Sequence, residues 1–144
     1  MLTTIILLSL LGSVIASAMG TFWYSPITPM GKWHMSYIGF DKLSKEEQDK
    51  KIKEVKPHMW KSYLGQFILS FFTSMFIIFV TLQTYKAAYV FVTMIWIAFI
   101  IPNIGSALIW GNCDKKLVWK KFFSDSLNNL VTYLLIVFMT TLFM

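Results

Sequence analysis

The longest apolar stretch decides the class of fold: residues 62–110 read SYLGQFILSFFTSMFIIFVTLQTYKAAYVFVTMIWIAFIIPNIGSALIW. Tyrosines apart, the only ionisable side chain within it is that of Lys86. About 20 apolar residues suffice for a helix to cross the hydrocarbon core of a bilayer, and the stretch holds one such length on each side of Lys86. We therefore predict two transmembrane helices, over residues 62–85 and 87–110, joined by a tight turn.

Two further apolar stretches lie towards the ends of the chain. Residues 2–24 contain no charged side chain, and residues 122–143 are apolar after a polar beginning. Residues 16–18 (ASA) resemble a signal-peptidase site, but no basic residue precedes them and the apolar character continues past them. We expect both stretches to be retained transmembrane helices. The chain is then a single all-α membrane domain, residues 1–144, built as a four-helix bundle.

The composition places the chain in lipid. Hydrophobic residues make up 56% of the sequence and charged residues only 14%, against about 25% charged residues in a typical soluble domain. All thirteen basic residues are lysines, whereas proteins that read nucleic acid use arginine for bidentate contacts to guanine. We therefore expect the lipid bilayer as a partner and no nucleic acid. Cys113 is the only cysteine, so a disulfide within the chain is excluded.

The lysines are divided unevenly between the predicted loops. Loop 25–61 contains eight lysines and loop 111–121 contains four, whereas Lys86 is alone on the opposite side. Lysine and arginine accumulate in cytoplasmic loops. We therefore predict that loops 25–61 and 111–121 are cytoplasmic and that both termini lie outside or in a lumen. The sequence leaves open which membrane holds the protein.

The polar loop 25–61 contains a predicted short helix. Ser44 and Glu47 have the spacing of a capping box, which predicts a helix from about Ser44 to Lys56. Ile52 and Val55 give this helix a thin apolar edge. One interpretation is that the edge rests on the membrane and the lysines attract anionic headgroups. We favour the alternative of a solvated helix, since the loop also contains five acidic residues.

Small residues form a stripe on the first predicted helix. Gly12, Ala16 and Gly20 are spaced by four residues and so share one face. Such stripes let helix backbones approach closely in lipid, where packing drives association. Two interpretations remain open: contact with another helix of the same chain, which we favour, and a face for dimerisation.

Polar side chains of the predicted spans gather in the cytoplasmic half of the bilayer. The set comprises Tyr24, Ser25, Gln66, Ser70, Asn103, Asp125, Asn128 and Asn129. We favour a network of hydrogen bonds that fixes helix packing. The alternative is a cavity, open to the cytoplasm, that binds a small polar molecule or ion. Asp125 stands at the start of its span, where it can pair with Lys120 or Lys121.

A short motif follows the first helix. It reads Trp23-Tyr24-Ser25-Pro26 and is followed by Gly31-Lys32 and Gly39. With the stretch from Trp96 to Pro102, where proline should kink the third helix, it resembles a family of small four-helix membrane proteins of unknown function. The resemblance covers nearly the whole chain and implies four helices and membrane residence, but no established activity.

No catalytic constellation stands out, and we expect no metal and no cofactor. His34 and His58 are the only histidines, whereas a zinc site needs three or four convergent ligands. Our leading hypothesis is a non-enzymatic multi-pass membrane protein, a structural or assembly component that packs with itself as a homo-oligomer or with other membrane subunits. The alternative is a small transporter or channel-like protein that uses the polar set. A membrane-embedded enzyme comes last, because neither histidine has an evident nucleophile beside it.

Overall fold

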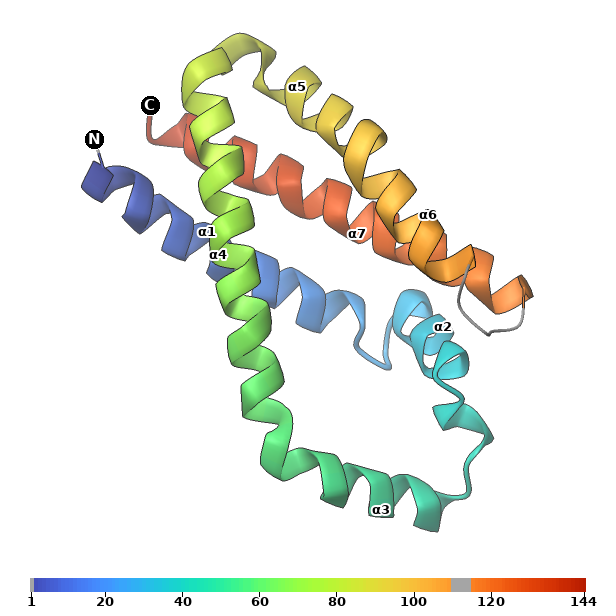
Figure 1. Cartoon of the computed structure of the whole chain (residues 1–144). Coiled ribbons are helices and arrows are strands. Elements are labelled where there is room, and N and C mark those ends of the chain that lie inside the picture. Colours follow the sequence, from blue (N-terminus) through green and yellow to red (C-terminus); the bar gives the residue numbers. More distant parts are fainter. Residues whose placement is uncertain (1, 110–114) are drawn as a thin grey trace.

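Helices make up every element within residues 2–109 and 115–144, the part of the chain that this computed structural model describes (Figure 1). In chain order the α-helices are α1 (Leu2–Trp23), α2 (Pro29–Tyr37), α3 (Lys45–Val55), α4 (Met59–Thr84), α5 (Ala88–Ile95), α6 (Ile101–Ile109) and α7 (Lys115–Leu142). The shorter elements are the 3-10 turns η1 (Phe40–Lys42), η2 (Lys56–His58) and η3 (Tyr85–Ala87) and the π-helical turn η4 (Trp96–Ile100).

Three helical stretches are long and apolar enough to cross a membrane: Leu2–Trp23, Lys45–Ile109 and Lys116–Leu142. The middle stretch folds back at η3, so that α4 and the pair α5–α6 form a hairpin (Figure 1). The tight turn that the sequence placed at Lys86 lies here. Tyr85 turns the chain with a φ of 37°, in the left-handed region that disfavours a residue with a side chain.

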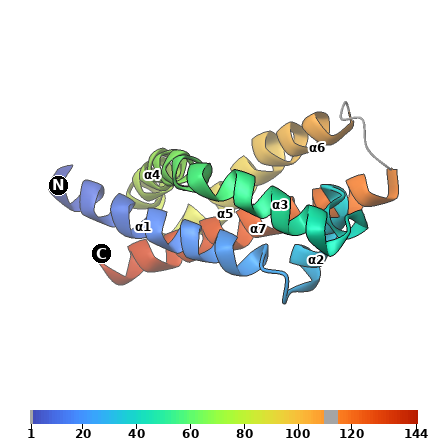
Figure 2. The ribbon, with the colours of Figure 1, turned by 90° about the horizontal axis from the view of Figure 1, so that it is seen from below.

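Helix α7 lies between α1 on one side and α5–α6 on the other (Figure 1). Helices α1 and α7 run side by side in opposite directions, so the two chain termini lie at the same end (Figures 1 and 2). Helix α4 crosses α1 and α7 obliquely and diverges from them towards α3. Helix α4 is therefore close to α1 and α7 near the termini and lies apart from them near the polar loop.

The apolar core lies in the half of the bundle that holds the termini. Its buried members are Leu8, Ile77, Ile78, Ala88, Val92, Tyr133, Ile136, Val137 and Met139. Two buried hydroxyls in the same half are satisfied within their own helix: Thr81 Oγ1 donates to the carbonyl of Ile77 at 2.7 Å, and Thr140 Oγ1 to that of Ile136 at 2.7 Å. Such bonds to the preceding turn satisfy the hydroxyl group and so reduce the free-energy cost of burying it between apolar helices.

The crossing of α1 and α4 depends on Gly12. A Cβ atom at this position would lie 2.8 Å from both Cβ and Oγ of Ser74 on α4, and 3.7 Å from Ile136 on α7. Gly12 is buried, whereas a Cβ at Gly20 would meet nothing within 4 Å. Of the stripe of small residues, Gly12 is therefore in close contact with α4 of the same chain, whereas Gly20 has free space beside it.

A π-helical turn lies where the sequence predicted a kink at Pro102. Proline lacks an amide hydrogen, and its ring clashes with the carbonyl four residues earlier. The helix accommodates both effects by widening at η4, two residues before the proline. Trp96, the first residue of η4, donates from Nε1 to the carbonyl of Ser126 at 2.8 Å and so ties the turn to α7.

Loop 25–61 contains more helix than the sequence indicated. The predicted short helix is present as α3, with Ser44 as its N-cap and a complete capping box with Glu47. The sequence missed α2, for which Thr28 is the N-cap and Pro29 the first residue. An N-cap threonine followed by proline is a typical helix beginning, so the signal was present in a helix too short to show a period.

Helix α7 begins earlier than the predicted span 122–143. Residues 115–121, placed in the basic loop by the sequence, form its first two turns. The helix extends because no glycine or proline interrupts them, and lysine and leucine are good helix formers. The remainder of the predicted loop, residues 111–114, lies outside the described residues.

Candidate functional site

The chain leaves α1 through a tight turn built on Gly31. Thr28 Oγ1 donates to the carbonyl of Trp23 at 2.6 Å and accepts from the amide of Gly31 at 2.9 Å. A Cβ atom on Gly31 would lie 1.9 Å from the carbonyl oxygen of Ser25, so only glycine fits here. The turn thereby brings Tyr24, α2 and the first part of α7 together.

Tyr24 and Asp125 meet across the end of α1. Tyr24 Oη donates to Asp125 Oδ1 at 2.5 Å, and Lys121 Nζ donates to both oxygens of the same carboxylate at 2.5 Å. The Lys121 and Asp125 side chains are only 13% and 19% exposed. Partial burial strengthens such an ion pair relative to a pair in open water. The sequence left Asp125 a choice of partner, and the structure pairs it with Lys121.

The Tyr24 hydroxyl keeps its proton in this setting. Burial raises the pKa of Tyr24 above its ordinary value, and the bond to the Asp125 carboxylate raises it further. Hydrogen bonds with Asn128 and Ser124 oppose this rise in pKa. Tyr24 is therefore a permanent donor to Asp125 at physiological pH, held between three side chains of α7.

His34 lies against the same tyrosine. Its ring centroid is 5.2 Å from that of Tyr24, with the planes tilted by 56°. Burial lowers the pKa of His34 below its ordinary value, the Lys121 ammonium lowers it further, and Asp125 acts in the opposite direction. The lowered pKa favours the neutral imidazole. The sequence did not indicate that His34 lies near Asp125.

Two buried polar atoms at this place have no hydrogen-bond partner: His34 Nδ1 and Asn128 Oδ1. We call Tyr24, His34, Lys121, Asp125 and Asn128 the Tyr24–Asp125 cluster. Its charges compensate each other, since one lysine faces one aspartate. Its unpaired atoms are an imidazole nitrogen and an amide oxygen, groups that can bind water or another small hydrogen-bonding molecule.

Aromatic and lysine side chains surround the cluster. Trp23 Nε1 donates to Ser124 Oγ at 3.1 Å, which joins the end of α1 to α7 beside the Tyr24 contact. Lys120 Nζ lies 5.9 Å from the ring centroid of Trp33 on α2. Lys121 Nζ lies 4.9 Å from the centroid of Tyr24. These contacts hold together three segments: the end of α1, helix α2 and the first turns of α7.

The structure brings together only part of the predicted polar set. Tyr24, Asp125 and Asn128 are in contact, as described above. Asn129 lies one residue further along α7 and donates from Nδ2 to the backbone carbonyl of Asp125 at 2.8 Å. These four residues share the end of the bundle where the polar loop begins.

The other members of the set lie elsewhere. Gln66 Nε2 donates to Ser70 Oγ at 3.3 Å, within α4. Asn103 is exposed on α6. Helix α4 diverges from α1 towards α3 (Figure 1), and Gln66 belongs to this first half of α4, apart from Asp125. Ser25 lies at the edge of a second feature, an apolar groove.

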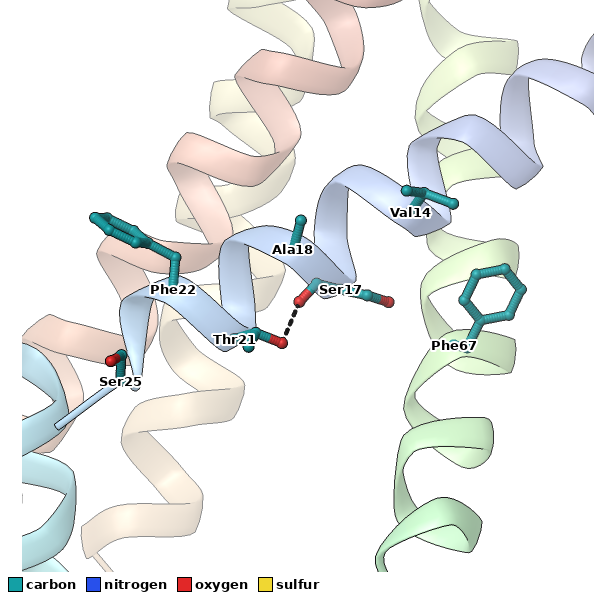
Figure 3. Close-up of a pocket in the computed structure, with 7 residues that line it drawn as sticks. All are labelled: Val14, Ser17, Ala18, Thr21, Phe22, Ser25 and Phe67. Carbon is teal, nitrogen blue, oxygen red and sulfur yellow. Dashed lines mark hydrogen bonds between the residues drawn. The ribbon is translucent and has the colours of Figure 1, made fainter. Parts of the chain in front are cut away.

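The apolar groove opens between the second half of α1 and the first half of α4 (Figure 3). Its lining residues are Val14, Ser17, Ala18, Thr21, Phe22, Ser25 and Phe67, around a volume of about 630 Å³. Thr21 Oγ1 donates to the carbonyl of Ser17 at 2.8 Å, so this hydroxyl is already satisfied. The groove is open to one side and presents mostly apolar surface.

Within the described residues no three side chains of histidine, cysteine, aspartate or glutamate converge as metal ligands. Comparison with family models finds one that matches residues 7–141, described as a protein of unknown function, DUF1761. The chain belongs to this family. No curated protein and no solved structure matches the chain. The DUF1761 match covers both the Tyr24–Asp125 cluster and the apolar groove but names no activity for either.

Proposed function

We propose that this DUF1761 protein crosses the membrane four times, with the Tyr24–Asp125 cluster on the cytoplasmic side. Support comes from the hairpin of α4 and α5–α6 and from the twelve lysines in the two loops at one end. Cys113 lies outside the described residues but within one of these loops. A thiol reagent that cannot cross membranes should label Cys113 only after the cells are opened. Labelling of intact cells would overturn the orientation.

Within that membrane, the protein is a structural or assembly component that packs with a second copy of itself or with another membrane subunit. The observation that carries this proposal is the apolar groove, which stays open in the single chain. Small side chains at Ser17, Ala18 and Thr21 line it, and small residues let a second helix approach closely in lipid. The Tyr24–Asp125 cluster supports the same function by holding the end of α1 firmly on α7.

A matched pair of substitutions tests the proposal. Ala18 lies in the groove and Ala107 lies on α6, and both are exposed. We expect the wild type to be a dimer in mild detergent by light scattering. Ala18→Phe should give monomers, whereas Ala107→Phe should remain dimeric. A monomeric wild type, or the same mass for both variants, would contradict self-association through the groove.

A second candidate function is a small transporter or channel-like protein. The specific observation in its favour is the pair of unpartnered buried atoms, His34 Nδ1 and Asn128 Oδ1, beside Asp125. Ionisable groups within a membrane protein often mark an ion or proton pathway. The protein in liposomes that contain a pH-sensitive dye should then dissipate a proton gradient, and Asp125→Asn should remove that activity while Asp49→Asn keeps it. A wild-type rate equal to that of empty liposomes would exclude proton transport.

A further inference from the structure

Helix α3 has little contact with the rest of the bundle. None of its eleven residues is buried, and it extends from the N-terminal end of α4, apart from α1 and α7 (Figure 1). A helix this short is marginal in water and depends on packing of an apolar face. Within the described residues, the apolar side chains of α3, Ile52 and Val55, are left exposed.

The two faces of α3 differ in charge. Gln48, Ile52 and Val55 are spaced by four and three residues and share one face. At 100° per residue, lysines flank this face on both sides, namely Lys45, Lys51 and Lys56. Apart from Glu47, which takes part in the capping box, the remaining charged residues line one shallow hollow on the other side: Glu46, Asp49, Lys50, Lys53 and Glu54. The apolar face is therefore bordered by positive charge, whereas the opposite face mixes both signs.

The orientation of α3 is fixed by Gln48. Its Nε2 donates to the carbonyls of Phe40 and Leu43, at 3.1 and 3.0 Å. Both carbonyls belong to the segment that connects α3 to α2. The face that Ile52 and Val55 share with Gln48 is therefore held to this segment at its Gln48 end and stays exposed beyond it. Ile52 is 49% exposed and Val55 is 57% exposed.

Aromatic residues mark the same level at the start of α4. Trp60 and Tyr63 are largely exposed, and Lys61 Nζ lies 5.8 Å from the ring centroid of Trp60. Tryptophan and tyrosine collect at the headgroup layer of membranes, and lysine extends its ammonium into it. The beginning of α4, which follows α3 closely along the chain, therefore has the composition of a membrane interface.

We propose that α3 is a membrane-surface helix that docks on anionic lipid headgroups, with Ile52 and Val55 inserted and Lys45, Lys51 and Lys56 facing phosphate or carboxylate groups. Charge complementarity selects the occupant, because the inserted face carries lysines at its borders while most acidic residues point away. The structure records no ion pair within 4.0 Å between acidic and basic side chains of this fully described helix, although Lys51 is near enough to Glu47 to lower the pKa of that carboxyl. The proposal rests on membrane residence and is independent of self-association.

The test compares hydrogen exchange of the α3 amides in the full-length protein in lipid nanodiscs. One set contains phosphatidylcholine alone, and the other contains phosphatidylcholine with phosphatidylserine. The variants are Lys45→Gln/Lys51→Gln and, with the same change in net charge on the opposite face, Lys50→Gln/Lys53→Gln. Lys45→Arg/Lys51→Arg changes the same two side chains but keeps their positive charge, and it serves as the charge-conserving control.

We expect phosphatidylserine to slow exchange in the wild type on the order of fivefold, and 1 M salt to remove the effect. Lys45→Gln/Lys51→Gln should lose the response, whereas the opposite-face pair and the arginine pair should keep it. Equal exchange in both lipids, or equal loss in both glutamine pairs, would overturn the proposal. Protection by inorganic phosphate in phosphatidylcholine alone would also overturn it, because the site would then recognise the free anion rather than the bilayer.

Discussion

Tyr24 Oη donates a hydrogen bond to Asp125 Oδ1 at 2.5 Å, across 101 residues of sequence. The contact joins the end of α1 to the third turn of α7, beside the Lys121–Asp125 ion pair. A hydrogen bond to a charged, partly buried acceptor contributes more to stability than a neutral one. The position of α1 against α7 therefore depends on a tyrosine that the sequence placed in the polar set without identifying its partner.

Removing this bond should destabilise the protein measurably. Tyr24→Phe keeps the ring and loses the donor, and we expect a cost of about 1.5–3 kcal/mol by thermal unfolding in detergent. Asp125→Asn should cost at least as much, because it also leaves the Lys121 ammonium without its carboxylate. The double variant should cost clearly less than the sum of the two, since both remove the same bond. Additive effects would show that the two side chains do not interact.

The titration of His34 should depend on its two charged neighbours. Lys121 lowers the pKa of His34 and Asp125 raises it, so Lys121→Gln should raise that pKa and Asp125→Asn should lower it. Nuclear magnetic resonance on a His58→Gln background would follow a single histidine. Because the folded pKa lies below the ordinary value of 6.5, the unfolded state binds more protons in this range. The contribution of His34 to stability is complete above pH 6.5 and is lost as the pH falls through the folded pKa. A pKa unchanged in both variants would contradict the geometry.

Gly12 and Gly20 should respond oppositely to alanine. At Gly12 the added Cβ meets Ser74 at 2.8 Å, and overpacking of this kind costs about 1–3 kcal/mol. At Gly20 the Cβ meets nothing within 4 Å, so the higher helix propensity of alanine should dominate and stability should rise by up to about 1 kcal/mol. Unfolding temperatures in one detergent provide the measurement. A neutral Gly12→Ala would mean that α1 and α4 cross elsewhere.

Gly31→Ala should disrupt the turn that follows α1. The added Cβ would lie 1.9 Å from a backbone oxygen of Ser25, which cannot move aside as a flexible side chain can. We expect faster hydrogen exchange throughout α2 and a lower unfolding temperature. Gly39→Ala is the control: its φ of 71° makes the substitution strained by about 1–2 kcal/mol, but no atom lies within 4 Å of the new Cβ. Its effect should stay local to η1, and equal effects on α2 would contradict a special role for Gly31.

The capping box of α3 predicts a pH dependence of that helix. Hydrogen bonds from the Ser44 backbone and hydroxyl lower the pKa of Glu47. The cap therefore stabilises α3 above the ordinary glutamate pKa and is lost as the pH falls through the lowered value. Ser44→Ala should return the Glu47 pKa towards its ordinary value and increase amide exchange in the first turn of α3. An unchanged Glu47 pKa would show that the box does not form in solution.

Local chemistry in the sequence was sufficient for much of the fold. Long apolar stretches predicted the helices that later appear as α1, α4 and α7, because an apolar stretch of about 20 residues is typical of a helix that satisfies its own backbone hydrogen bonds. Ser44 and Glu47 predicted α3, and Pro102 predicted the distortion at η4, because capping and the missing amide of proline act within a few residues. The expected membership of a family of unknown function was also confirmed, because the DUF1761 model matches residues 7–141.

Only the tertiary structure decided which polar residues meet. His34 joins Tyr24 and Asp125 because the turn at Gly31 places α2 against α7. Gln66 remains apart because α4 diverges from that end (Figure 1), and Asn103 remains apart because it is exposed on α6, although α6 packs against α7. The sequence of the first helix likewise offered Gly12 and Gly20 as equivalent members of one stripe. The oblique crossing with α4 made one a close contact and left the other open. Helix formation depends on neighbours along the chain, whereas the cluster and the crossing depend on contacts between segments more than sixty residues apart, which no local pattern encodes.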